Sequence, residues 1–92
     1  MPTVLIPGAL RRFTAGQAEL RVEATTVRAA LAAVDRQFPG VAARVLDGDA
    51  PRPFIRLFVD GDDIDARAGL DTPLADRGEL AIVPAIAGGR GA

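Results

Sequence analysis

Reactive side chains are scarce in this sequence, and their scarcity draws attention to the end of the chain. The 92 residues include no Cys, His, Tyr or Trp, and all 11 cationic side chains are Arg. Thiol nucleophiles, disulfides, imidazole bases and zinc sites of the usual ligand set are therefore excluded. The remaining reactive groups are carboxylates, guanidinium groups, Thr hydroxyls and the two chain termini.

Two adjacent glycines in the closing sequence PAIAGGRGA could take part in chemistry without any reactive side chain. Gly88 and Gly89 lack a Cβ, so an extended chain can pass there through a channel too narrow for other residues. A terminal glycine also has an unhindered carboxylate. Once joined to AMP, such a carboxylate is an acyl donor, and a sulfur nucleophile can displace AMP to leave a thiocarboxylate.

Two acidic segments are weaker candidates for a site. Counted from Asp60, the pattern of an EF-hand calcium loop requires an oxygen ligand at the fifth place and Gly at the sixth, where Ile64 and Asp65 stand instead. This segment therefore favours a solvated hairpin. Residues 47–49 favour a polar turn, because no Gly-rich loop with Lys follows them. The sequence predicts no metal site.

Overall composition limits the classes of function. With 49% hydrophobic and 25% charged residues, the chain is expected to fold as one small globular domain. Its net charge is −1 and it has no basic run, so nucleic-acid binding is not expected. No apolar stretch could cross a bilayer, and the start lacks the features of a secretory signal, so we expect no membrane partner and a cytoplasmic location.

Hydrophobic periodicity predicts the elements of the first half. Residues 3–7 and 18–24 predict two strands, which we expect to pair with each other. Residues 25–40 have apolar side chains at helical spacing, with Thr25 or Thr26 as N-cap and Pro39-Gly40 as the stop. Residues 41–46 predict a short helical turn that runs into a loop.

The second half predicts the rest of a sheet. Residues 54–60 predict a strand, Asp60-Gly61 a tight turn, residues 62–66 a brief returning strand and residues 79–85 a last strand. Together these elements predict an α+β fold of the β-grasp, ubiquitin-like type, with a mixed sheet of four to five strands packed on one main helix. We expect this domain to span residues 1–87, followed by a flexible Gly-Gly tail with a short extension at residues 88–92.

The strand at residues 54–60 leaves one question open. Phe58 points to the opposite face from Leu57, so either the fold covers that face or Phe58 belongs to an exposed patch that docks another protein. Leu80 in the last strand and Ile86 and Ala87 beside the tail are further candidate binding residues.

Three segments carry a family resemblance: residues 3–7, residues 25–40 and the closing residues 58–89. They resemble the ubiquitin-like sulfur carriers of the MoaD and ThiS family, most closely its CysO branch, and the likeness covers nearly the whole chain. It implies a carrier that is not itself an enzyme and binds no cofactor. An E1-like enzyme of the MoeB or ThiF type would adenylate Gly89 with ATP and Mg²⁺. The sulfur of the resulting thiocarboxylate would pass to an enzyme such as a CysM-type cysteine synthase.

Arg90, Gly91 and Ala92 depart from the family pattern, because they leave Gly89 without a free carboxylate. Some members of the family are trimmed after Gly-Gly by a zinc metalloprotease of the JAMM type, and we predict the same maturation here. The alternative is a dispensable tail on a different kind of protein. Two other functions stay open: the small subunit of molybdopterin synthase, and a β-grasp interaction module with an inert terminus.

Overall fold

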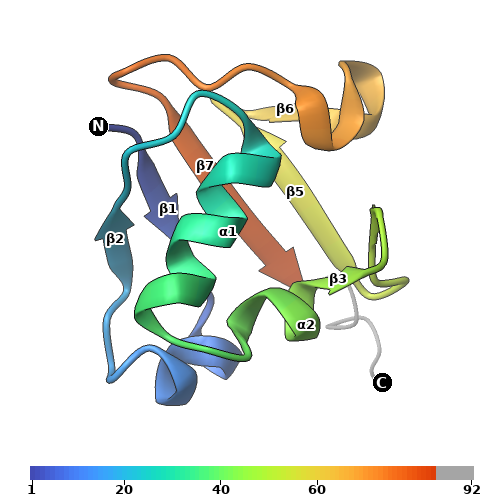
Figure 1. Ribbon diagram of the computed structural model, residues 1–92. Coiled ribbons are helices and arrows are strands. Elements are labelled where there is room, and N and C mark those ends of the chain that lie inside the picture. Colours follow the sequence, from blue (N-terminus) through green and yellow to red (C-terminus); the bar gives the residue numbers. More distant parts are fainter. Residues whose placement is uncertain (85–92) are drawn as a thin grey trace.

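A mixed sheet packed against one main helix forms the molecule. The computed structural model describes residues 1–84, and Figure 1 shows the helix in front of the sheet. The strands lie in the order β2-β1-β7-β5-β6. β1 and β7 are parallel, and the other neighbouring pairs are antiparallel. Their bounds are Glu19–Arg21 (β2), Thr3–Leu5 (β1), Glu79–Pro84 (β7), Ile55–Val59 (β5) and Asp62–Asp63 (β6). The predicted α+β fold is confirmed, with the last strand at the centre of the sheet.

The main helix α1, Val27–Gln37, begins and ends as its sequence predicts. Of the two candidate N-caps, the structure selects Thr26, whose hydroxyl accepts a hydrogen bond of 3.1 Å from the Ala29 amide. The helix ends at Gln37, two residues before the predicted stop Pro39-Gly40, and Gly40 has a φ of 104° that a residue with a Cβ rarely adopts.

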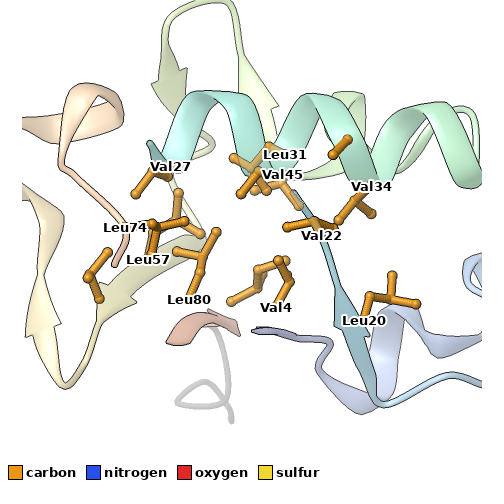
Figure 2. Packing of buried hydrophobic residues seen from close by; sticks show 14 of the residues in the cluster. Val4, Leu20, Val22, Val27, Leu31, Val34, Val45, Leu57, Leu74 and Leu80 are labelled. Atoms are coloured by element: carbon orange, nitrogen blue, oxygen red, sulfur yellow. The ribbon is translucent and has the colours of Figure 1, made fainter. Parts of the chain in front are cut away.

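The core lies between α1 and the sheet. Figure 2 shows Val4, Leu57 and Leu80 pointing from three adjacent strands toward the helix. Leu31 and Val34 on α1 face them and are at most 1% exposed. Burial of each such side chain stabilises the fold by about 1.5–3 kcal/mol relative to leaving it in water. This contact fixes β7 in the middle of the structure.

Two local predictions differ from the structure, and one element was not predicted. Residues 8–13 form a 3₁₀ helix, η1 (Gly8–Phe13), which sequence periodicity could not reveal because none of its residues is buried. The predicted helical turn is α2 (Val41–Val45), but the expected loop after it contains a hairpin of β3 (Leu46–Asp47) and β4 (Ala50–Pro51). The predicted strand at residues 62–66 is wrong after β6, because residues 64–66 form the 3₁₀ helix η2 (Ile64–Ala66).

The chain's amino group is tied to the loop before β7. The Met1 ammonium group donates a hydrogen bond of 2.7 Å to Asp76, 75 positions away in the sequence. This hydrogen bond, supported by Coulomb attraction, lowers the pKa of the Asp76 carboxyl.

A titration can test this contact. A carboxyl whose pKa falls on folding stabilises the folded state above its unfolded pKa of about 3.9. That contribution is lost as the pH falls through the folded pKa. We expect NMR titration to give Asp76 a lower pKa in the native chain than in a chain acetylated at Met1, with little change in stability because both groups are exposed. Equal pKa values in the two chains would contradict the contact.

Candidate functional site

The candidate site begins where β7 leaves the sheet. β7 pairs with β1 on one side and with β5 on the other, and its last residue, Pro84, lies opposite Ile55. Proline has no N–H to donate, which costs least at the end of a strand. The predicted site residues Ile86, Ala87, Gly88 and Gly89, and the predicted domain boundary after residue 87, lie outside the described residues.

β7 runs toward the end of the molecule where α2 and β3 lie (Figure 1). β5 runs antiparallel to β7, so the β5–β6 turn lies at the opposite end of the sheet. The two ends of the sheet therefore differ in the elements that surround them.

The acidic segment forms the β5–β6 hairpin, as predicted. Asp60 and Gly61 have φ values of 49° and 89°, the signs that a two-residue hairpin turn of type I′ requires. The Asp60 carboxylate accepts a hydrogen bond of 3.0 Å from the Glu79 amide. Asp62 and Asp63 form ion pairs of 3.2 Å with nearby Arg side chains. Within residues 1–84, no group of His, Cys, Asp or Glu side chains is arranged to hold a metal ion.

Apolar side chains meet on the sheet face that points away from α1. Ala81 on β7 lies between Leu5 on β1 and Phe58 on β5, and Val83 follows two residues later on the same face. Phe58 is only partly buried, and Val83 is 39% exposed. We call Leu5, Phe58, Ala81 and Val83 the open-face patch. The structure leaves Phe58 half-buried on this face, between the two alternatives, and its docking role stays a prediction.

The prediction that Leu80 offers an exposed docking surface is wrong. Leu80 is fully buried and points toward α1, as Figure 2 shows. Successive residues of a strand point to opposite faces, so Leu80 and Ile82 fill the core while Ala81 and Val83 face outward. The sequence assigned residue 80 to the wrong face, although it identified the strand correctly.

Sequence reasoning missed an exposed aromatic residue near the end of β7. Phe54 is 63% exposed and immediately precedes Ile55, the partner of Pro84. Its place in the predicted strand at residues 54–60, four residues before Phe58, was the available signal, but the structure places Phe54 in a turn just before β5. We therefore add Phe54 to the surface near the site.

No helix in the described part of the chain is long and apolar enough to cross a membrane. Residues 1–84 thus place partly exposed apolar side chains, Val83 and Phe54 among them, near the end of β7.

Comparisons with known proteins include residues beyond Pro84. The model of the ThiS family matches residues 4–89. The sulfur carrier protein CysO of Mycobacterium tuberculosis (strain H37Rv) is 32% identical over 90 residues, which cover 95% of this chain and 97% of that protein.

Solved structures give the same result. A chain in the Amycolatopsis orientalis BexX/CysO complex aligns with a TM-score of 0.92 and 31% identity, over 97% of this chain and 100% of that one. CysO of Mycobacterium tuberculosis aligns with a TM-score of 0.87 and 28% identity, over 92% of this chain and 99% of that one.

Proposed function

The chain belongs to the ThiS family, and from this premise we propose that it is a sulfur carrier protein whose reactive atom is the carbonyl carbon of Gly89. The extent of the family match is the observation that supports this most. The match begins in β1 and ends at Gly89, the second glycine of the pair. The relatives named as sulfur carriers also match over nearly the full length of the chain.

The proposed chemistry requires only a carboxylate on Gly89. One carboxylate oxygen attacks the α-phosphorus of ATP, pyrophosphate leaves, and an acyl adenylate forms. A sulfur nucleophile at the oxidation level of sulfide then attacks the acyl carbon, and the bond to AMP breaks to leave a thiocarboxylate. An E1-like enzyme of the MoeB or ThiF type supplies the ATP and Mg²⁺ for these steps. The chain is therefore a substrate of that enzyme and not a catalyst.

Removal of Arg90, Gly91 and Ala92 must come first in this proposal. While they are attached, the Gly89 carbonyl is part of a peptide bond and has no oxygen that can attack ATP. The family match stops before these three residues, which supports treating them as an extension to be removed. We propose that a JAMM-type zinc metalloprotease cleaves after Gly89.

The geometry of the described residues fits delivery of a terminal glycine. β7 is held on both sides by other strands, so Pro84 is a fixed starting point. The residues from 85 to 89 can span at most about 18 Å when fully extended, enough to reach a buried active site. Gly88 and Gly89 would add no side chain in a narrow channel.

The open-face patch flanks β7 and is suited to dock the enzymes that receive this terminus. Besides the activating enzyme, these partners include the enzyme that accepts the sulfur. We propose a CysM-type cysteine synthase, or another enzyme that makes a sulfur-containing metabolite.

Intact-protein mass spectrometry tests the proposal directly. The chain is co-expressed with the E1-like enzyme and the metalloprotease from the same source. The expected product lacks Arg-Gly-Ala and has one oxygen replaced by sulfur. An unchanged full-length mass under these conditions would count against a sulfur carrier. Stable co-purification with a large catalytic subunit would instead support the small subunit of molybdopterin synthase.

A further inference from the structure

A group of Arg side chains gathers where η1 meets α2. The guanidinium carbon of Arg44 on α2 lies 3.7 Å from the ring centroid of Phe13 on η1, and that of Arg12 lies 5.1 Å from the same centroid. Both distances are within the range of cation–π interactions. One aromatic ring therefore attracts two guanidinium groups and keeps them near each other despite their like charge.

Backbone carbonyl groups hold two more guanidinium groups at this end. The Arg52 Nε donates a hydrogen bond of 2.8 Å to the Ala43 carbonyl, and the Arg11 Nε donates one of 3.0 Å to the Ile6 carbonyl. A guanidinium has five N–H donors, so each of these groups has others available. We call Arg11, Arg12, Arg44 and Arg52 the arginine cluster.

The arginine cluster differs from three other arginines in its side-chain partners. Arg28, Arg56 and Arg67 each form an ion pair with an Asp side chain. Within residues 1–84, none of the four cluster arginines forms such a pair. Asp35, a nearby acid, accepts hydrogen bonds from the Gly40 and Ala42 amides at the start of α2. Among the described residues the cluster arginines thus form no ion pair, although Asp47 lines a hollow together with one of them, Arg52.

The arginine cluster lies beside a groove at the end of the molecule where β7 stops. This groove has a volume of about 370 Å³, and Arg12, Phe13, Arg44 and Arg52 line it together with Ala9, Leu10 and Ala43. Arg52 lies three residues before Ile55, the strand partner of Pro84. The groove and the end of β7 therefore lie at the same end of the molecule, as Figure 1 shows for α2 and β7.

We propose that the groove between η1 and α2 binds an acidic protein segment on the activating enzyme, next to the opening that admits the C-terminal glycines. This proposal rests on the proposed function, because it assigns a partner to the same terminus. Guanidinium groups already fixed by Phe13 and by backbone carbonyls lose little conformational entropy when they bind carboxylates. The apolar part of the lining, Ala9, Leu10 and Ala43, suits acidic residues mixed with small apolar ones.

A protein segment fits these observations better than a nucleic acid. The chain has a net charge of −1, and the β5–β6 hairpin at the opposite end of the sheet is acidic, so an extended polyanion would be repelled beyond the groove. A short acidic segment needs only the local positive charge.

Charge reversal with a matched control tests the proposal in the chain that ends at Gly89. We expect R12E/R44E to raise the KM for this chain in ATP–pyrophosphate exchange by the activating enzyme about tenfold, with kcat changed less than about twofold. The control R21E/R77E makes the same change in net charge on exposed residues away from the groove and should leave the KM within about twofold. R12K/R44K keeps the positive charge at both positions and therefore separates the loss of charge from a loss of fold. Thermal melts monitored by circular dichroism compare the stability of all four chains.

A second measurement does not depend on the enzyme. A synthetic polyglutamate peptide is titrated into the ¹⁵N-labelled chain, with oligouridylate of equal length as the competing polyanion. The expected peptide-induced NMR shifts cluster at residues 9–13 and 43–45 and disappear in folded R12E/R44E but not in R21E/R77E. Preferential binding of the RNA, or equal KM values and shifts for the two double variants, would overturn the acidic-segment proposal. Absence of exchange by the unsubstituted chain would instead refute the proposed function, and the peptide titration would still decide this inference.

Discussion

A chain that retains Arg90, Gly91 and Ala92 is expected to support no detectable ATP–pyrophosphate exchange by the E1-like enzyme, whereas a chain that ends at Gly89 should be fully active. In the longer chain, the Gly89 carbonyl is an amide and its oxygen is a poor nucleophile. The only main-chain carboxylate is then on Ala92, which can lie up to about 10 Å farther along an extended chain. Pyrophosphate exchange with purified proteins, and no protease present, measures this difference.

A substitution in the shorter chain separates the position of the carboxylate from its accessibility. Gly89→Val keeps a terminal carboxylate at residue 89 but adds a β-branched side chain next to it. We expect exchange to fall by at least about a hundredfold, because displacement of a reacting group by about 1 Å can have that effect. Ala85→Val, farther from the reacting carbon, is the matched control and should retain most of the activity. Equal exchange by the full-length and shorter chains would refute Gly89 as the reacting residue.

Leu80→Ala is expected to destabilise the fold by about 2–5 kcal/mol, the range for truncation of a fully buried Leu. Leu80 lies on the central strand and faces α1, so its removal leaves a cavity in the middle of the core (Figure 2). A domain of this size is stable by only about 5–15 kcal/mol, so the loss would be large. Urea denaturation followed by circular dichroism measures the free energy of unfolding.

Substitutions in the open-face patch are expected to leave the fold stable, in contrast to Leu80→Ala. Val83→Ala changes the same strand on its exposed side and should cost less than about 1 kcal/mol. Phe58→Ala should likewise leave the fold intact but raise the KM for the activating enzyme, because it removes the largest apolar group of the patch. Similar destabilisation by the Leu80 and Val83 substitutions would contradict the assignment of the two strand faces.

The sequence determined those features that depend on neighbouring residues. The apolar spacing of residues 27–34, a cap at Thr25 or Thr26 and the stop at Pro39-Gly40 predicted α1 because they act within a few turns of one helix. The dipeptide Asp60-Gly61 predicted its hairpin for the same reason. The Gly88-Gly89 pair and the absence of Cys and His, both properties of residue type alone, led to the proposal for the chemistry of the terminus.

The tertiary structure decided what depends on contacts between distant residues. Alternation shows that Leu80 and Ala81 face opposite ways, but only the packing of α1 on the sheet shows which of them is buried. The arginine cluster arises because η1 and α2, about thirty residues apart, meet at Phe13. Local spacing determines the conformation of a segment. Which of its faces is buried, and with which distant elements it forms a common surface, depends on the long-range packing of the core.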